Sequence, residues 1–471
     1  MEERKDIKAP VMSLPELADL RERANEYYWL PLRQAKEDDI RENLKIIVGG
    51  KGCRVWDAEG KEYLEACASD WTAAVGYGRK ELADVAYEQL TKIPHVDPFG
   101  NYAAPSTINF ATKLAQIAPG TLSKVFTISG GSEANESALK LARQYQARNG
   151  FPKRFKFVSR KLCYHGATFA CQSLSTDLFF RAYLNEPLLP GCIRVAHPYC
   201  YRCDFGLEYP ACNLLCAKQV EQVIQVENPS TVAAVILDAV SVQAFASVPP
   251  PEYLPLIREI CDRYGILMIM DEVVCGFGRT GKWFGCNHWD VVPDIMTLDK
   301  GISSGYLPLS AVVVKEEVAA KFIGTQKDAF PHGHTWWGHP VACAVGLANI
   351  EIIERERLVE NAAEMGAYFL DALHSALDKS AMVGNIQGLG LLIAIELVSD
   401  KKTKERFTGA EAARLRQKLT NELLERGLIA QVSSIYISLL PPLIITKAEI
   451  DEIVHILEVS IREAEKEMMP D

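Results

Sequence analysis

The chain has 471 residues, of which 48% are hydrophobic and 24% charged, and its formal net charge is −10. This composition is typical of a globular protein with a large core and two domains, and it argues against disorder. The net negative charge provides no general attraction to phosphate backbones or anionic lipids, so we expect neither a nucleic acid nor a membrane as partner.

The N-terminus, MEERKDIKAP, is charged from its second residue, unlike the apolar start of a secretory signal. No apolar run approaches the roughly 20 residues that a membrane-spanning helix needs. The expected location is therefore the cytoplasm, where most of the thirteen cysteines would be reduced thiols.

Strand-like and helix-like segments alternate along most of the chain. Residues 54–66 predict two short strands about a turn, and residues 80–93 have the apolar spacing of a helix. Apolar, β-branched runs predict further strands at residues 123–129, 231–240, 266–274 and 309–315. Such alternation predicts an α/β fold with a mostly parallel sheet and helices on both of its faces.

Beyond this region the chain becomes mostly helical, with strand-like pieces in GLGLLIAIELV and SIYISLL. We therefore predict a large domain at residues 71–337 and a smaller α+β domain at residues 338–471. Residues 1–70 are expected to contribute to the smaller domain.

A glycine-rich turn follows the predicted strand VFTIS in the sequence GGSEANES. The turn lets the backbone approach a ligand closely, and the next helix presents free N–H groups and the positive end of its dipole. Gly131 and Ser132 therefore form a candidate phosphate cradle. The alternative is that these glycines serve only the geometry of the turn.

Two charged residues follow apolar strands farther along. Asp271, in ILMIMDEVVCGFGRTG, needs a cationic partner to stay ionised at the end of a buried strand, and Lys300 follows the run PDIMTLD. A structural ion pair and a solvated lysine are the plain alternatives. Together with the cradle, however, the two residues suit pyridoxal 5′-phosphate, with Lys300 carrying the aldehyde as a Schiff base and Asp271 holding the pyridine nitrogen protonated.

The motifs DEVVCGFGRTGKWFG and PDIMTLDKGISSGYLPLSAV resemble those of the class III pyridoxal-phosphate-dependent aminotransferases of the ω-amino acid and amine:pyruvate type. The resemblance extends from about residue 40 to the C-terminal helix. It implies the fold of type I pyridoxal-phosphate-dependent transferases, with Lys300 as the catalytic Schiff-base lysine and Asp271 as the partner of the pyridine nitrogen.

The same resemblance assigns further contacts with the cofactor and substrate. Val273 would pack on one face of the ring, Tyr164 of the YHG motif would stack on the other and reach the substrate, and Gly131 and Ser132 would bind the phosphate. Thr335 would reach the phosphate of a neighbouring subunit, which implies a homodimer or a tetramer. Trp71 would be the pocket aromatic, unless it is simply a core residue.

The chain departs from the family where substrate carboxylates are usually gripped. DAVSVQ replaces the common Glu-Pro-Val-Gln, with Asp238 and Ala239 at its first two positions, and Gln431 and Ser438 stand where relatives carry arginines. A bidentate arginine is the usual recogniser of a carboxylate. We therefore predict Gln431 as a substrate contact and a small monocarboxylate such as pyruvate as the favoured acceptor.

A cysteine cluster in YCYRCDFGLEYPACNLLC comprises Cys200, Cys203, Cys212 and Cys216. A CxxC followed by a CxxxC could build a zinc or iron-sulfur site. The gap between the pairs is short, so we favour reduced thiols and predict no metal.

Three functions fit these observations. The leading one is ping-pong amino transfer from a primary amine or ω-amino acid to a small keto acid. Racemisation or epimerisation of an amino acid on the same scaffold is the alternative, and motifs alone do not separate the two. A non-catalytic binding protein is the third, and the presence of Lys300, Asp271 and the phosphate loop together argues against it.

Overall fold

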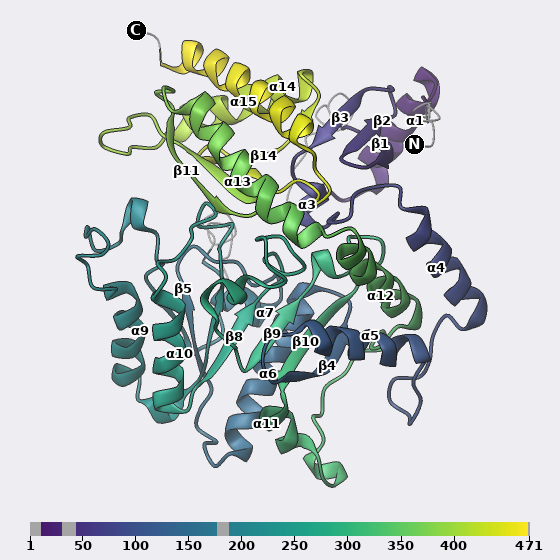
Figure 1. The fold of residues 1–471 in the computed structure, drawn as a ribbon, viewed down its shortest axis with the longest axis vertical. Helices are drawn as coiled ribbons and strands as arrows, with labels where there is room; N and C mark the ends of the chain where they lie inside the picture. The colour runs from purple at the N-terminus through teal and green to yellow at the C-terminus, as the bar shows by residue number, and fades with distance from the viewer. Residues whose placement is uncertain (1–10, 31–43, 177–187, 470–471) are drawn as a thin grey trace.

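A computed structural model describes residues 11–30, 44–176 and 188–469, so the charged N-terminal decapeptide lies outside the described residues (Figure 1). One seven-stranded sheet and two four-stranded sheets form its framework. None of the described helices has the length and apolar character needed to cross a membrane.

The seven-stranded sheet has the order β4-β10-β9-β8-β7-β5-β6. Its strands are β4 (Leu122–Ile128), β5 (Lys156–Arg160), β6 (Cys192–Val195), β7 (Val232–Asp238), β8 (Leu267–Asp271), β9 (Ile295–Leu298) and β10 (Ser310–Lys315). The run from β6 to β9 is parallel, whereas β10 is antiparallel to both of its neighbours. The connection from β9 to β10, residues 299–309, contains only the short turn η4 (Lys300–Ile302) and no crossover helix, so β10 runs in the opposite direction.

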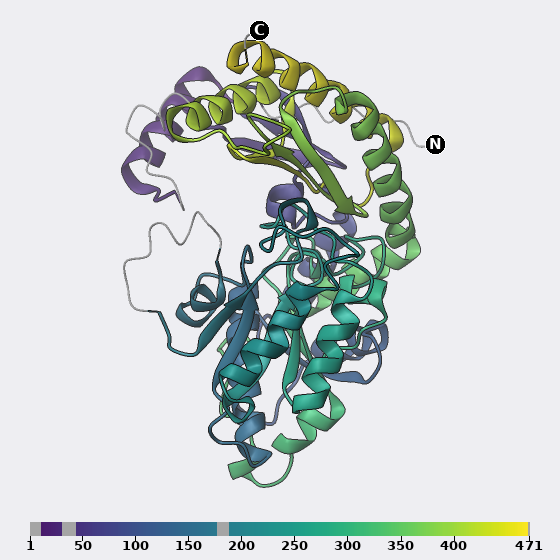
Figure 2. The same ribbon diagram turned by 90° about the vertical axis from the view of Figure 1, so that its left-hand side faces the viewer.

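Helices cover both faces of this sheet, as predicted (Figures 1 and 2). One face packs against α5 (Pro105–Ile117), α9 (Leu215–Val226), α10 (Tyr253–Tyr264) and α12 (Pro340–Arg355). The other packs against α6 (Gly131–Arg148), α7 (Phe169–Leu174) and α11 (Glu316–Ala319). Helix α6 buries Ala134, Ala138, Leu141 and Ala142 against the sheet, with Tyr145 partly buried beside them.

The N-terminal and C-terminal parts of the chain lie together above this sheet (Figure 1). The first small sheet contains β1 (Ile47–Lys51), β2 (Arg54–Asp57), β3 (Glu62–Glu65) and β13 (Leu428–Ile429), with β13 parallel to β3. The second contains β11 (Val383–Leu389), β12 (Leu392–Leu397), β15 (Tyr436–Leu439) and β14 (Gln431–Val432). The domain boundaries at residues 70 and 337 remain a prediction.

The remaining helices join or cover these sheets. They are α1 (Leu14–Tyr27), α4 (Lys80–Lys92), α13 (Leu358–Leu377), α14 (Gly409–Glu425) and α15 (Lys447–Met468). The short element α3 (Ala68–Trp71) is a turn in which all four residues have left-handed φ values. Short 3-10 turns occur at η1 (Cys200–Arg202), η2 (Pro229–Thr231), η3 (Gly285–Trp289), η5 (Ala320–Phe322) and η6 (Gln326–Asp328).

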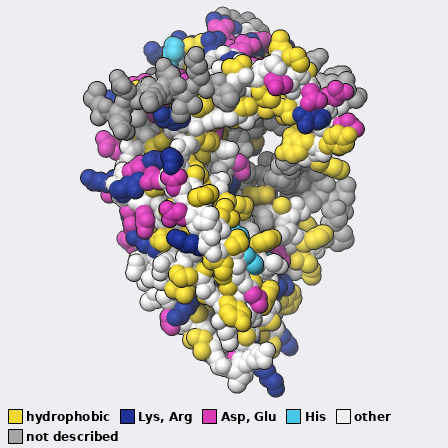
Figure 3. Space-filling view, turned by 90° about the vertical axis from the view of Figure 1, so that its right-hand side faces the viewer, with side chains coloured by type: hydrophobic (Ala, Val, Ile, Leu, Met, Phe, Trp, Pro, Cys, Tyr) yellow, Lys and Arg dark blue, Asp and Glu magenta, His cyan; other side chains and the backbone are white. Residues whose placement is uncertain are grey.

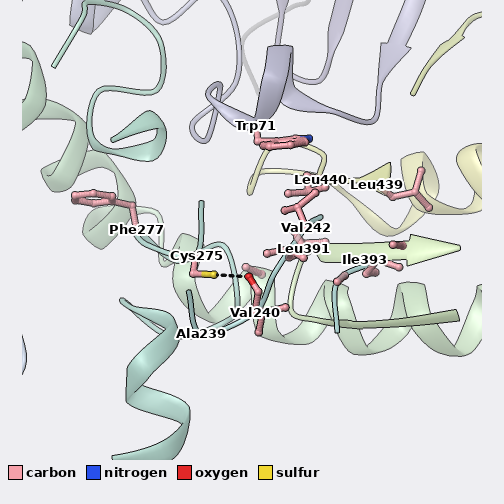
Figure 4. Close-up of a cluster of buried hydrophobic side chains, with 14 of the residues drawn as sticks. Trp71, Ala239, Val240, Val242, Cys275, Phe277, Leu391, Ile393, Leu439 and Leu440 are labelled. Carbon is pink, nitrogen blue, oxygen red and sulfur yellow. Dashed lines mark hydrogen bonds between the residues drawn. The ribbon is translucent and has the colours of Figure 1, made fainter. Parts of the chain in front are cut away.

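A buried apolar cluster connects the large sheet to the second small sheet. Figure 4 shows Trp71 and the segments after β7 and β8 meeting Leu391, Ile393, Leu439 and Leu440 of the small sheet. The Cys275 thiol donates to the Val240 carbonyl at 3.1 Å within this cluster. Beside it, the Arg279 guanidinium donates to the carbonyls of Leu391 and Pro441. The loop after β8 is therefore bound directly to the C-terminal part of the chain.

Helix α13 packs very closely on the turn between β11 and β12. A Cβ atom on Gly366 would lie 2.2 Å from the Gly390 carbonyl oxygen, and one on Gly390 would lie 2.3 Å from the Thr280 carbonyl carbon. Neither contact involves a flexible side chain, so relief requires backbone movement.

We expect Gly366→Ala to lower the free energy of unfolding by about 3 kcal/mol or more, because the added methyl group overpacks a backbone contact. Urea unfolding of the purified protein measures the change. Glu364→Ala, at an exposed position of the same helix, is the matched control and should change stability by less than about 0.5 kcal/mol. Equal stability of the two variants would contradict the close packing.

Candidate active site

The predicted site residues lie together at the carboxyl edge of the parallel strands, where ligands bind in open α/β sheets. Asp271 ends β8, Lys300 follows β9, and α6 begins at Gly131 after β4. Two hydrogen bonds connect these elements: Gly131 N–H donates to Asp299 Oδ2 at 2.9 Å, and the Asn135 amide donates to Asp271 Oδ2 at 2.8 Å.

Asp271 is 5% exposed and is held by three donors. Its Oδ2 accepts from Asn135 and from His165 Nδ1 at 2.7 Å, and its Oδ1 accepts from Val273 N–H at 3.1 Å. Burial alone lowers the pKa of His165, but the adjacent Cys163 and Asp271 raise this pKa well above its ordinary value. The carboxylate therefore has a cationic partner within the protein.

Glu272 points away from Asp271 and has a structural role. It is fully buried and accepts from the N–H groups of Gly285 and Cys286, both at 2.7 Å, at the start of η3. Burial raises the pKa of Glu272 to about 7 despite these hydrogen bonds. The second carboxylate of the Asp-Glu pair thus stabilises the loop after β8.

The glycine-rich turn is crowded by side chains from the neighbouring strands. A Cβ atom on Gly131 would lie 2.9 Å from Asp299 Oδ2 and 3.2 Å from a Val273 methyl group, so only glycine fits without a shift. Ser132 Oγ accepts from Ala167 N–H at 3.0 Å. This bond brings the YHG segment, with half-buried Tyr164, to the first turn of α6.

Lys300 is not a freely solvated lysine. Its side chain is 15% exposed, and its Nζ donates to the carbonyl oxygen of Asp70 at 2.8 Å and to Asp70 Oδ2 at 2.9 Å. The same Nζ lies 4.6 Å from the centre of the Trp71 ring. The site is therefore covered by a turn from the N-terminal part of the chain.

The predicted substrate positions lie around Cys67. Gln431 N–H donates to the Cys67 sulfur at 2.9 Å, and the thiol donates to the Ser438 carbonyl at 3.2 Å. Gln431 and Ser438 are cross-strand partners of β14 and β15. Among the described residues, Gln431 Oε1, Ser438 Oγ and Trp71 Nε1 are buried without a hydrogen-bond partner, so they could donate to or accept from a ligand.

Two other predicted features are Thr335 and Asp238, the latter being the cross-strand neighbour of Asp271. Thr335 is exposed in the segment before α12, so its assigned contact concerns a surface of the subunit. Asp238 forms an ion pair with the buried Arg160, which lowers the pKa of Asp238 below its ordinary value although burial raises it. All thirteen cysteines are free, and in the part of the chain that the structure describes no group of three or more side chains is arranged to hold a metal.

Sequence reasoning missed four residues of the site: Asp70, Asn135, His165 and Asp299. Asn135 lies one helical turn after Gly131 and therefore on the same face of α6, which was a usable signal. His165 and Asp299 are chain neighbours of Tyr164 and Lys300. Asp70 is likewise the chain neighbour of Trp71, but its approach to Lys300 depends on a contact between residues 230 positions apart.

Known aminotransferases resemble this chain over most of its length. A putrescine–pyruvate aminotransferase of Pseudomonas aeruginosa is 37% identical over 410 residues, covering 87% of this chain and 89% of its own. A taurine–pyruvate aminotransferase of Bilophila wadsworthia is 38% identical over 440 residues, covering 91% and 93%. The crystal structure of a PLP-bound amine transaminase from an uncultivated Pseudomonas species superposes with a TM-score of 0.88 at 35% identity, covering 93% of this chain and 99% of that one.

These findings define the class of protein. The fold is that of type I pyridoxal-phosphate-dependent transferases, with a mostly parallel sheet flanked by helices, and the protein is an aminotransferase. The family model of the class III aminotransferases matches residues 37–461, and the chain belongs to that family.

The carboxyl group of Asp299 generates a pH-dependent prediction. Burial raises its pKa to about 6, above its ordinary value of 3.8. The protonated group therefore favours the folded state below pH 4, and this contribution is lost as the pH rises through 6. Between pH 4 and pH 7 the wild type should therefore lose roughly 2 kcal/mol of unfolding free energy that Asp299→Asn does not lose. The stability of the variant relative to wild type should rise by that amount.

Urea unfolding of the cofactor-free protein at the two pH values checks this expectation. Asp371→Asn, at an exposed position of α13, is the control and should follow the wild type. A constant difference between Asp299→Asn and wild type would show that Asp299 is ionised in the folded protein across the whole range.

Proposed function

We propose that this protein binds pyridoxal phosphate and transfers an amino group from a primary amine or ω-amino acid to a small keto acid, with pyruvate favoured, by a ping-pong mechanism. The observation that carries the proposal is the convergence of Lys300, Asp271 and the start of α6 at one edge of the sheet. The names of the two relatives, which combine an amine donor with pyruvate, support it.

The residues present fit this cofactor. Asp271, held by Asn135 and His165, offers negative charge to a protonated ring nitrogen. A Cβ atom on Gly130 would meet nothing within 4 Å, so the start of α6 has room for a phosphate on that side. Val273 lies beside Gly131, where it could pack on the ring. We assign Tyr164 to the opposite ring face and Thr335 to the phosphate of a neighbouring subunit. When bound, pyridoxal phosphate supplies the aldehyde and the electron-accepting ring that amino transfer requires.

The protein's own residues have separate roles in this reaction. Asp271 keeps a charge next to the ring nitrogen, and His165 and Asn135 orient its carboxylate and stabilise its ionised form. Lys300 is the group that we assign to accept and return a proton at the reacting carbon, because its amine is the base nearest to the proposed cofactor aldehyde.

The preference for a monocarboxylate acceptor follows from the neutral side chains at positions 431 and 438. Of the two unpaired atoms, the Ser438 hydroxyl can donate to one carboxylate and Gln431 Oε1 can only accept, and neither side chain provides a positive charge for a second carboxylate. A dicarboxylate would bury an unpaired charge, which usually costs several kcal/mol. Racemisation remains the alternative that the sequence leaves open, but the relatives are named as aminotransferases and favour transfer.

We also propose a homodimer, or a tetramer built from it. Exposed apolar side chains gather on the face formed by α4, α5 and the segment between them (Figure 3). They are Tyr87, Leu90, Ile93, Phe99, Tyr102 and Ile108, and Trp336 beside Thr335 is 57% exposed. An exposed apolar surface of this kind is typical of an interface between subunits. The cytoplasmic location remains a prediction.

Lys300→Ala should abolish amino transfer while non-covalent cofactor binding persists, because the variant lacks both the covalent anchor and the base. Activity assays with pyruvate and an amine donor measure the loss of transfer, and a shift in the visible absorption band of the bound cofactor reports the missing covalent link. Lys80→Ala, which removes an exposed lysine of α4, is the control and should keep wild-type activity. An active Lys300→Ala enzyme without added amine would overturn the assignment.

Pyruvate should exceed 2-oxoglutarate by at least about tenfold in kcat/KM, a difference of roughly 1.4 kcal/mol, because no arginine stands at position 431 or 438. Steady-state kinetics with one saturating amine donor and each keto acid provides the ratio. A clear preference for 2-oxoglutarate would show that another cationic group binds its second carboxylate.

A further inference from the structure

A carboxylate lies at the start of α6, where we place the cofactor phosphate. Asp299 Oδ2 accepts from the Gly131 N–H at 2.9 Å, and a Cβ atom on Gly131 would lie 2.9 Å from the same oxygen. The first N–H groups of a helix have no partner within the helix, which makes them the usual donors to a bound phosphate. Asp299 therefore uses a donor that the phosphate would also use.

The backbone holds Asp299 in this place. Side chains two residues apart on a strand point to the same face, and both Thr297 of β9 and Asp299 directly after β9 contact α6. The Thr297 hydroxyl donates to Asn135 at 2.8 Å, one helical turn beyond Gly131. Asp299 continues the strand with extended dihedral angles, φ −161° and ψ −161°. Its contact with α6 follows from the position of β9 on that helix and does not involve the side chain of Lys300.

The charges around Asp299 decide when it is ionised. Asp271 at the end of β8 and Glu133 in the first turn of α6 are negative, whereas Lys300 and the start of α6 are positive. Burial raises the pKa of Asp299 to about 6, with a further contribution from Asp271, although Lys300 and neighbouring backbone N–H groups lower this pKa. The carboxyl group therefore changes its charge close to neutral pH.

The two forms of this carboxyl group would meet a phosphate differently. A phosphate monoester is strongly anionic at neutral pH. An ionised carboxylate can only accept hydrogen bonds, so it competes with the phosphate for the Gly131 N–H and repels it. A protonated carboxyl group has no charge and can donate its O–H to a phosphate oxygen. Asp299 is partly exposed, so a ligand at the start of α6 can reach it.

We propose that Asp299 is a further phosphate-binding residue with a pH-dependent effect: when protonated it donates a hydrogen bond to the cofactor phosphate, and when ionised it keeps the Gly131 N–H and weakens cofactor binding. The inference rests on the proposed function, because it assumes this cofactor. Binding of the phosphate is then coupled to the uptake of a proton by Asp299. The affinity for the phosphorylated cofactor therefore falls as the pH rises above 6.

Two ligands that form no covalent bond with Lys300 test the proposal. Pyridoxamine 5′-phosphate and pyridoxamine differ only in the phosphate, and neither has an aldehyde. Calorimetric titration of the full-length, cofactor-free protein at pH 5 and pH 8 provides the dissociation constants.

At pH 8, Asp299→Asn should bind pyridoxamine 5′-phosphate at least about tenfold more tightly than the wild type, because the variant has no charge to oppose the phosphate. At pH 5, where Asp299 is protonated, the two proteins should differ by less than about threefold. Pyridoxamine should bind equally to both proteins at each pH.

Two further variants complete the test. Asp299→Ala removes the whole carboxyl group and should also bind pyridoxamine 5′-phosphate more tightly than the wild type at pH 8, so the test does not depend on the folding of one variant. Asp371→Asn removes a carboxylate from an exposed position of α13 and should follow the wild type at both pH values.

The outcomes separate this inference from the proposed function. Equal affinity of the wild type and both Asp299 variants for pyridoxamine 5′-phosphate at pH 8 overturns the inference, and so does tighter binding by the wild type. A difference that is the same at pH 5 and pH 8, or one that pyridoxamine also shows, would mean that Asp299 has only a structural role. Failure of all these proteins to bind pyridoxamine 5′-phosphate would instead overturn the proposed function.

Discussion

The site depends on keeping one buried carboxylate charged. Asp271 lies at the end of a strand whose residues are fully enclosed by apolar neighbours, where an isolated negative charge would be very costly. His165 and Asn135 offset this cost with two hydrogen bonds to the same oxygen. Burial lowers the pKa of His165, but Cys163 and Asp271 raise it well above its ordinary value, so His165 carries positive charge. Asn135 is fixed in turn by Thr297, whose hydroxyl donates to its side-chain oxygen at 2.8 Å. Helix α6 and strands β8 and β9 are thereby held in one polar network.

A second constraint is the packing contact between the large sheet and the C-terminal part of the chain, made by Arg279, Gly366 and Gly390, which we call the seam. Arg279 uses its guanidinium on backbone carbonyls of the small sheet, and Gly366 and Gly390 let helix α13 approach the turn that Arg279 binds. Burial lowers the pKa of this arginine to about 10, so the charge is retained at neutral pH. The seam places Trp71, Gln431 and Ser438 over the end of the parallel strands. The proposed substrate contacts therefore come from parts of the chain that do not belong to the sheet holding Lys300.

The two halves of the site make different electrostatic demands. The part built on the sheet presents Asp271, Asp299 and Lys300, and suits a ligand that carries both a cationic ring and a phosphate. The covering part presents Asp70 and neutral hydrogen-bonding groups. Relatives of this chain are named for donors as different as putrescine and taurine. We expect this variation in donors to depend on the covering part, because the sheet edge holds the residues proposed to bind the cofactor.

The sequence by itself determined the framework and the residues at the sheet edge. Periodicity located the strands that became β2 to β4, β7, β8 and β10, and the residues following strands in a parallel sheet must meet at one edge, so the order of residues alone was enough to group Asp271, Lys300 and Gly131. Local rules could not place Asp70, Gln431 or Ser438, nor show that His165 and Asn135 converge on Asp271. Those contacts join segments with no shared periodicity, through a left-handed turn that residue preferences disfavour. Only the packing of the small sheets on the large one decides them, because it alone supplies the hydrogen bonds that stabilise such a turn.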